Sequence, residues 1–569
     1  MKGPMKKLIV LSFCLATILA SAQSTPSAPA KVKSRSVSAP SISPAAQSAM
    51  KAIDGEKMRW HVRFLSHDLL EGRGTGARGG DIAAEYIGTQ FALYGLQPAG
   101  NNGTYLQNVP IVLGTTKPES TFTLIPASGD SMTLKYLDDY VSNNESLTAI
   151  ADIDAPIVYV GFGIEAPKYK WDDYKGIDVK GKVLLMNVNE PTSDDPKFFE
   201  GRALTYFGRW TYKYEEAARK GAVGVILIHK TEMASYGWDV VRNSWGSERA
   251  YLRDSNPKLK AASWVQLEVA HKLVASSGLD LDKLMKSAES RDFKPVELKA
   301  RLKAHIVSTM KDSKSANVVA ILPGSDPILK SEAIIYSAHY DHLGIHPDQP
   351  GDNIYNGAAD NATGCAILLE MARAYASIPA AQRPKRSVIF AAVTAEEQGL
   401  RGSEFLGQKP PIPAGKISLG LNFDDIPPIG VPEQVEVTGA ERQSIYPEVQ
   451  ATAKEFGFTI VPDSRPEAGH YYRSDHFSFS RVGIPSFSVN EGMKYVGHDE
   501  AWGKKEADDY TANRYHQPSD EYKPSMTFTG NAKMAQFGFA LGWKAANDPA
   551  LVKWTPGDEF EPARKASQK

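Results

Sequence analysis

Short apolar runs alternate with helical patterns in the C-terminal half of the chain. The runs lie at 317–324 (NVVAILPG), 332–339 (EAIIYSAH), 386–393 (RSVIFAAV), 416–423 (KISLGLNF) and 483–489 (GIPSFSV). Helical periodicity lies between them, notably at 364–378 and 402–406. Strands that are apolar on both faces and alternate with helices are typical of a mostly parallel sheet covered on both sides. We therefore predict an α/β fold, a three-layer α/β/α sandwich around a mostly parallel mixed sheet.

The middle third of the chain has a different pattern. Its short runs at 155–164, 181–188 and 222–229 are rich in β-forming residues. They predict a separate β-rich domain, and this stretch shows no cluster of potential metal ligands or nucleophiles. We place the inserted domain at 126–304, which leaves the α/β domain discontinuous, at 51–125 and 305–550.

The first residues have the pattern of a secretory signal peptide. Three lysines precede an apolar run at 8–19, and the small residues Ala20-Ser21-Ala22 follow it. The run is short for a bilayer span, although a retained N-terminal anchor is the alternative, and no later stretch reaches about 18 uninterrupted apolar residues. Cleavage after residue 22 predicts an exported protein, periplasmic or extracellular, without stable membrane association.

Two further segments look poorly suited to a packed core. Residues 23–50 are rich in Ser, Ala and Pro with few large apolar side chains, so they are interpreted as a flexible linker. Residues 551–569 are interpreted as an exposed, charged tail.

Composition narrows the class of protein. The 569 residues suggest two to four domains, and 42% are hydrophobic, as in ordinary globular proteins. There are 65 basic and 66 acidic residues, so no excess of positive charge is available for binding nucleic acid. After cleavage only Cys365 remains, which excludes disulfides within the chain. Nothing in the sequence indicates an oligomeric state.

Carboxylate and imidazole side chains follow three of the predicted strands or open a predicted helix. They are His339 and Asp341, Glu396 and Glu397, Asp424 and Asp425, and Asp360 in the loop GAADNATG. Ligands of open α/β sheets bind at the carboxyl ends of the strands, so these groups should converge. Like-charged carboxylates at ~4 Å cost about 4 kcal/mol per pair at an effective dielectric constant of ~20, which calls for a cation.

The ligand types narrow the choice of metal. Carboxylates and imidazole without thiolates suit zinc, cobalt or manganese, and two ions sharing a bridging carboxylate would use the ligands well. The side chains of Glu396 and Glu397 should diverge at the strand end. One can then hold a metal while the other acts as a general base, whereas two solvated surface glutamates are the plainer alternative.

The motifs together resemble the M28 family of zinc-dependent exopeptidases. The resemblance lies in SAHYDHLG, NGAADNATG, TAEEQGLRGSEF, LNFDD, SDHFSF…GIPSF and YHQPSDE, in that order. The segment LLEGRGTGARGGDIAAEYI…YGLQPAG looks like the start of that family's catalytic domain. YVGFGIEAP, DVKGKVLL and EEAARKGAVGVILI make 126–304 look like a protease-associated domain. The resemblance covers most of the chain beyond residue 50.

The resemblance implies roles for individual residues. Asp360 would bridge two zinc ions or other divalent transition metals, with Glu397 and His516 completing one site. His339 and Asp424 would complete the other. Glu396 would be the general base, and Asp341 would fix the ring of His339 from behind. The family usually has an apolar residue directly after this aspartate ligand, so the adjacent pair Asp424-Asp425 departs from the family pattern. The Asn-Phe-Asp spacing indicates that Asp424 is the ligand.

The implied activity is that of an exported aminopeptidase, which removes N-terminal residues from peptides with a free N-terminus. Tyr471 or Tyr472 would donate a hydrogen bond to the developing oxyanion, although core or rim tyrosines are the alternative. Arg473 would pair either with a substrate carboxylate or in a structural salt bridge. His342 and His346 are interpreted as loop histidines.

Other functions stay open on the same sequence. A carboxypeptidase should show an arginine-lined pocket for the substrate carboxylate, and a glutaminyl cyclase needs a single zinc. A receptor-like ectodomain would have lost metal ligands that this chain keeps. A serine hydrolase and an HExxH metalloprotease are disfavoured, since neither Gly-x-Ser-x-Gly after a strand nor HExxH occurs.

Overall fold

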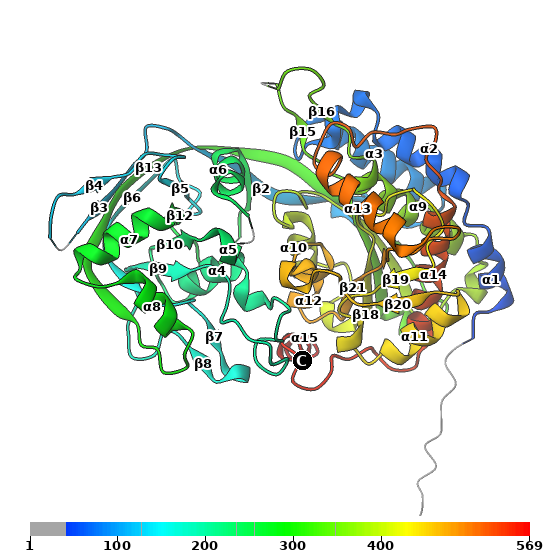
Figure 1. Ribbon diagram of the computed structural model, residues 1–569. Coiled ribbons are helices and arrows are strands. Elements are labelled where there is room, and N and C mark those ends of the chain that lie inside the picture. The colour runs from blue at the N-terminus through cyan, green and yellow to red at the C-terminus, as the bar shows by residue number, and fades with distance from the viewer. Residues whose placement is uncertain (1–40, 127, 235, 255, 348) are drawn as a thin grey trace, which may run out of the picture. The chain divides into compact units, whose positions relative to one another are not determined.

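The computed structural model describes residues 41–569, except 127, 235, 255 and 348 (Figure 1). The predicted signal peptide and residues 23–40 of the predicted linker lie outside the described residues. The described residues all belong to one compact unit. Among the described residues, no helix combines the length and the apolar character needed to cross a membrane.

Parallel strands form the centre of the predicted α/β domain. In spatial order they are β21 (Ser486–Ser488), β18 (Ile417–Asn422), β14 (Ala333–His339) and β17 (Ser387–Val393). The long strand β13 (Val296–Leu322) pairs antiparallel with β17, and β2 (Leu106–Thr116) and β1 (Gln97–Pro98) pair antiparallel with β13. The sheet is therefore mixed and mostly parallel, as predicted.

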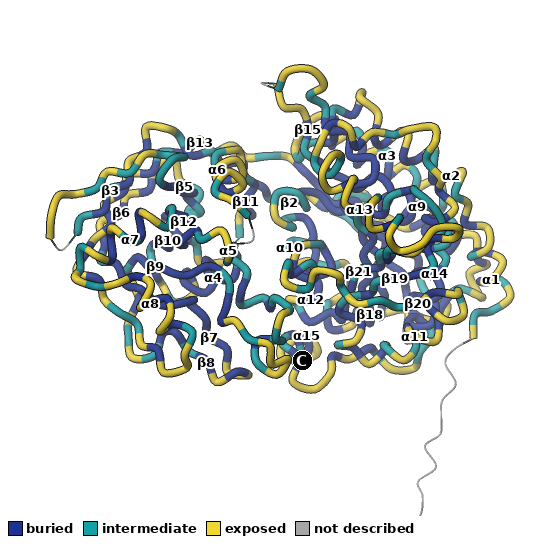
Figure 2. The backbone as a smooth tube through the Cα atoms, viewed as in Figure 1, coloured by how far each residue is buried: buried dark blue, intermediate teal, exposed yellow. Residues whose placement is uncertain are grey.

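Alternate side chains of the central strands face two different helical layers. Ile334 and Tyr336 of β14 belong to a core with helices α2 (Gly55–Leu65), α3 (Arg78–Leu93), α9 (Gly364–Ala376) and α14 (Thr529–Asn547). Ala333 and Ile335 point to the opposite core, with α10 (Arg401–Gln408) and α12 (His476–Arg481). Every residue of β14, β17 and β18 is buried (Figure 2), which explains their continuous apolar sequence. The three-layer prediction is confirmed.

The second lobe, residues 121–307, shares strand β13 with the α/β domain. The first part of β13 pairs with β3 (Thr121–Ile125) and β6 (Ile150–Tyr159), while its later part pairs with β2 and β17. The predicted boundary at 304/305 thus falls inside one strand. Side chains alternate between buried and exposed from Glu297 to Ser308, and residues 309–314 of the same strand, which follow, are exposed or half-buried.

The second lobe has its own cores and sheet. Strands β9 (Val183–Asn187), β10 (Gly224–His229) and β12 (Ala261–Gln266) extend from β6 in parallel, and β5 (Tyr140–Asn143) closes the row. The helices are α4 (Trp210–Arg219), α5 (Thr231–Ala234), α6 (Trp238–Gly246), α7 (Leu267–Ser276) and α8 (Leu281–Ala288). Short strands are β4 (Met132–Thr133), β7 (Glu165–Ala166), β8 (Trp171–Asp172) and β11 (Arg249–Leu252).

The remaining elements surround the α/β domain. Strands β19 (Gln434–Glu436), β20 (Thr459–Val461) and β22 (Asn490–Glu491) form a small sheet, and β15 (Gly344–Ile345) pairs with β16 (Ile354–Tyr355). The other helices are α1 (Pro44–Lys51), α11 (Tyr446–Glu455), α13 (Glu500–Asn513) and α15 (Glu561–Ser567).

The flexible-linker prediction is wrong for its last residues. The side chain of Ser43 accepts a hydrogen bond from the Ala46 amide and begins α1. Ala46 and Ala49 are buried in the core with α9 and α14. The prediction counted large apolar residues, whereas alanines let a short helix pack closely against its neighbours.

The charged-tail prediction is also wrong. Trp554 and Phe560 are buried in an aromatic cluster with Tyr471, Tyr472 and Phe477. The charged residues near them have buried partners as well, since Arg442 pairs with Asp558 and Glu559 at 2.7 Å. Asp558 and Glu559 therefore form ion pairs with the α/β domain instead of being solvated.

His61 of α2 predicts acid sensitivity of the fold. Its side chain is buried, its Nδ1 lies 2.9 Å from the Tyr86 hydroxyl, and burial lowers its pKa to about 4. An unfolded histidine titrates near 6.5, so the unfolded state binds the proton more tightly and stability is lost as pH falls from 6.5 to 4. His61→Gln should remove about 3 kcal/mol of this loss, measured by denaturant unfolding at pH 7 and pH 4. An unchanged pH dependence would contradict the assignment.

Candidate metal centre

Parallel pairing brings the ends of three strands to one edge of the sheet. His339, the last residue of β14, is in register with Val393 of β17, and Ser337 is in register with Asn422 of β18. Glu396 and Asp424 follow Val393 and Asn422 by a few residues. The strand ends therefore deliver these side chains to the same place, as parallel strands require.

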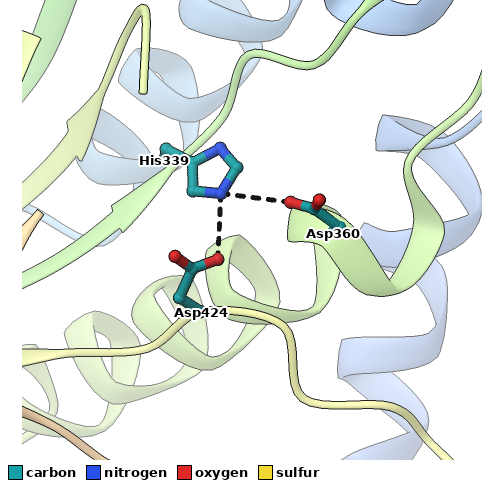
Figure 3. A group of neighbouring side chains, drawn as sticks. All are labelled: His339, Asp360 and Asp424. Atoms are coloured by element: carbon teal, nitrogen blue, oxygen red, sulfur yellow. Dashed lines mark hydrogen bonds and ion pairs between the residues drawn. The ribbon is translucent and has the colours of Figure 1, made fainter. Parts of the chain in front are cut away.

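One group of side chains gathers around the imidazole of His339 (Figure 3). Its Nε2 lies 2.9 Å from Asp424 Oδ1 and 3.2 Å from Asp360 Oδ1. The ligand atoms of these three residues all lie within 4.8 Å of one another. Nδ1 of the ring lies 3.1 Å from the backbone carbonyl of Asp341, which orients Nε2 towards the carboxylates.

A second group shares Asp360 with the first. His516 Nε2 lies 3.2 Å from Asp360 Oδ2 and 3.1 Å from Glu397 Oε2. His342 Nδ1 lies 2.7 Å from Glu397 Oε1. The two carboxylate oxygens of Asp360 thus face different imidazoles, His339 and His516, which is the arrangement of a bridging ligand.

Asp360 and Asp341 are held by buried hydrogen bonds. The Asp520 carboxylate accepts hydrogen bonds of 3.1 Å from the amides of Ala359 and Asp360. Asp341 accepts a hydrogen bond from the Glu396 amide at 3.1 Å and one from the Thr75 hydroxyl at 3.2 Å. Asp341 therefore fixes the backbone of the residue predicted as general base.

A chain of side-chain hydrogen bonds positions Asp424. Ser337 of β14 donates to Asn422 at 2.7 Å, and Asn422 donates to the Ser474 hydroxyl at 2.8 Å. Ser474 donates to Asp424 Oδ2 at 2.5 Å, which leaves Oδ1 facing His339. The neighbouring Asp425 belongs to neither group of ligand atoms among the described residues.

The electrostatics of the centre favour a bound cation. Burial lowers the pKa of His516, but Glu397 and Asp360 outweigh it and raise that pKa to about 11. Among the described residues, no lysine or arginine forms an ion pair with the converging carboxylates. The nearby Arg73 guanidinium donates instead to the backbone carbonyls of Leu65, Tyr340, Asn356 and Gly357.

The donors fit a divalent transition metal. Oxygen and imidazole nitrogen atoms converge without thiolates, which suits zinc and its neighbours. The Nε2 atoms of His342 and His516 are buried and make no geometrically sound hydrogen bond within the described residues. A metal would satisfy such an orphaned nitrogen and offset the carboxylate repulsion.

The predicted ligands come together, whereas the predicted oxyanion donors do not. His339, Asp360, Glu397, Asp424 and His516 lie in the two groups, and Glu396 lies beside His339. Tyr471 bonds to Ser480 and Ser486, while Tyr472 donates to Glu559. Their hydroxyls serve the aromatic cluster of the C-terminal segment, so the oxyanion prediction is wrong.

Sequence reasoning missed three side chains of the centre. His342 was interpreted as a loop histidine, but its ring is buried beside Glu397. Its position directly after Asp341, where the strand end still points into the crevice, is the signal that was available. Asp520 and Ser474 have no comparable signal, because they act from loops whose placement depends on the tertiary fold. His346 is a loop histidine as predicted and packs on Tyr355.

Comparison with known proteins shows that part of the chain is similar to a peptidase family. The family model described as Peptidase family M28 matches residues 317–537, less than half of the chain. A probable zinc metalloprotease of Pyricularia oryzae is 39% identical over 101 residues, covering 17% of this chain and 18% of that protein. A probable zinc metalloprotease of Pyrenophora tritici-repentis is 25% identical over 279 residues, which cover 42% of this chain and 53% of that protein. The matched part of the chain thus spans about a fifth to about half of the length of these curated relatives.

A solved structure is similar at low identity. The aminopeptidase from Aneurinibacillus sp. strain AM-1 is 18% identical, with a TM-score of 0.47, and the match covers 90% of this chain and 98% of that one.

Proposed function

We propose that the protein is a metallo-aminopeptidase, which removes N-terminal residues from peptides with a free N-terminus. The match of residues 317–537 to the model of peptidase family M28 supports this proposal. The observation that carries this proposal is Asp360, whose two carboxylate oxygens face His339 and His516 separately. The names of the relatives support zinc as the metal.

Two zinc ions would use the ligands fully. Glu397, His516 and Asp360 would hold one ion, and His339, Asp424 and Asp360 the other. When bound, the ions supply Lewis-acid polarisation of the scissile carbonyl and a lower pKa of the attacking water. Other divalent transition metals fit the same donor set. A glutaminyl cyclase is disfavoured because both His339 and Asp424 are kept.

Glu396 is the proton carrier in this proposal. Its carboxylate accepts the proton of the attacking water and delivers it to the leaving nitrogen. Its amide is tied to Asp341, which holds the carboxylate beside His339. Burial raises the pKa of Glu396 well above its usual value, and neighbouring carboxylates add to this shift against the opposing charge of His339.

An acidic side chain beside the ligands favours an aminopeptidase. Oδ1 of Asp425 is buried and has no hydrogen-bond partner within the described part of the chain. In this proposal the ammonium group of the substrate binds next to Asp424 and is contacted by this oxygen. Asp425, the departure from the family pattern, thereby gains a role in recognising the free N-terminus.

Two further proposals concern the rest of the chain. Its N-terminal pattern supports export to the periplasm or the extracellular space, with cleavage after residue 22. The sequence similarity noted above supports a protease-associated domain in the second lobe, inserted into a discontinuous catalytic domain. Its own hydrophobic cores support separate folding of that lobe.

Free and N-blocked substrates test the proposed function. The purified protein should hydrolyse aminoacyl-arylamides and leave their N-acetylated counterparts intact, because the ammonium group is required at the site. Chelation should abolish turnover, and added zinc should restore it. Turnover of blocked substrates alone would contradict the aminopeptidase, and turnover insensitive to chelators would contradict the metal mechanism.

A further inference from the structure

The loop between β17 and α10, residues 394–400, carries Glu396 and Glu397 on a strained backbone. Ala395 and Leu400 have φ angles of +54° and +64°, in the left-handed region that disfavours residues with a side chain. Such a conformation persists where surrounding contacts hold it in place. The contacts around this loop therefore set the position of the carboxylate that is proposed to carry the proton.

The second lobe supplies one set of these contacts through strand β11. This strand lies between α6 and β12 in the chain, but it pairs antiparallel with β2 of the α/β domain (Figure 2) and with no other strand of the described residues. Its other edge is therefore open to side chains. The amide of Ala250 donates to Gln398 Oε1 at 3.3 Å, and the carbonyl of Ala250 accepts a hydrogen bond from Arg401 Nε at 3.1 Å.

Apolar packing strengthens the same junction. Ala250 and Leu252 of β11 are buried in one hydrophobic cluster with Ala395 of the loop and with side chains of β2. Close packing of this kind transmits a displacement from one segment to the next. Because Ala395 directly precedes Glu396, the position of β11 affects the backbone of the proposed proton carrier.

The residue before Ala250 ties β11 to the interior of the second lobe. Cζ of Arg249 lies 5.1 Å from the ring centre of Trp245 and 5.7 Å from that of Trp210, within the range of cation–π contacts. Trp245 is buried in a hydrophobic core of the second lobe, and Trp210 packs against this core. Two consecutive residues of β11 thus connect that core to the loop of Glu396.

We propose that Gln398 and Arg401 are positioning residues, which bind β11 of the second lobe and thereby hold Glu396 in the orientation needed for proton transfer. The second lobe in this way contributes to the rate of the chemical step, while the metal ions are held by the ligands described above. This inference rests on the proposed function, because it requires Glu396 to be the proton carrier.

The double variant Gln398→Ala/Arg401→Ala removes both hydrogen bonds to β11. Its kcat on a leucyl-arylamide should fall about 10- to 100-fold, since a misplacement of ~1 Å at a reacting group has an effect of this size. KM and bound zinc should stay close to the wild-type values, because the ligands and the substrate are not contacted by these side chains in the proposal. Gln398→Glu and Arg401→Lys keep an acceptor and a donor, so each should retain most of the activity.

A second background separates positioning from a general structural effect. In Glu396→Gln the proton carrier is absent, so adding the two alanine substitutions should lower the remaining kcat little. An equal fold loss in both backgrounds, or a double variant with the wild-type kcat, would overturn the inference. Glu404→Gln is the matched control, because it removes the 3.1 Å ion pair between Arg401 and Glu404 and should keep the wild-type kcat.

Hydrogen exchange tests the contact without relying on activity. The amides of Gly399 and Leu400 donate to the carbonyl of Glu396 at 2.8 and 2.9 Å, and they should exchange faster in the double variant, with or without zinc. Unchanged exchange in this loop would overturn the inference, whereas a wild type that leaves aminoacyl-arylamides intact would contradict the proposed function. Exchange in β14 should stay the same and reports that the variant is folded. If the double variant does not fold, Gln398→Ala alone, at a half-buried position, gives the same comparison.

Discussion

Replacement of Glu396 by glutamine should lower kcat by about 100- to 10,000-fold, the usual contribution of a general acid–base group. The amide of glutamine cannot accept the proton of the attacking water, although its shape preserves the packing beside His339. KM should change little, because the carboxylate is not proposed to bind substrate. Steady-state kinetics on a leucyl-arylamide measure both constants.

Measurement of bound zinc distinguishes loss of the general base from loss of the metal in the Glu396 variant. Glu396→Gln should bind as much zinc as the wild type, since the other carboxylates and imidazoles supply the ligands. Glu85→Gln changes an exposed glutamate of α3 and should keep full activity. A Glu396→Gln protein that is fully active would remove the proton carrier from the proposal, and one that is inactive and free of zinc would make Glu396 a ligand instead.

Replacement of Asp360 by asparagine should have an even larger effect. Its two oxygens face His339 and His516, so the loss of negative charge should weaken both metal positions at once. Metal ions contribute several kcal/mol of transition-state stabilisation, so kcat/KM should fall roughly 1,000-fold or more. Bound zinc per chain, measured by mass spectrometry after dialysis, should fall well below that of the wild type.

The control for Asp360→Asn is the same substitution of aspartate by asparagine at a position far from the metal centre in the sequence. Asp194→Asn alters an exposed aspartate of the second lobe and should retain zinc and activity. An Asp360→Asn protein that keeps both zinc and activity would show that Asp360 is not a bridging ligand. Circular dichroism distinguishes loss of metal from loss of fold.

The α/β domain and the ligand groups could be predicted because each depends on a local pattern. Strands buried on both faces have continuous apolar sequences. Because the strands are parallel, the residues that follow them lie at the same edge of the sheet. His339, Glu396 and Asp424 are therefore readable from their positions after β14, β17 and β18. Asp360 was a candidate because it precedes a predicted helix, whereas His516 was identified only through the sequence resemblance.

The failed predictions share a physical cause. Tyr471 and Tyr472 lie one turn from Ser474, but their direction is set by Phe560 and Trp554, some 80 residues further along the chain. The C-terminal segment looked solvated because its charges were counted without their partners, Arg442 among them. Long-range partners of this kind leave no signal in the segment itself.

The continuity of β13 has a mechanical consequence. The chain enters the second lobe from β2 to β3 and leaves it along β13, and these segments are hydrogen-bonded to one another on both sides of the passage. The connection between the lobes is thus made of paired β-strands. Separating the lobes would distort the backbone hydrogen bonds between these strands, whereas a flexible linker would allow free rotation. We expect any movement of the second lobe to be small and to bend this paired ribbon, because the backbone hydrogen bonds of β13 resist free rotation.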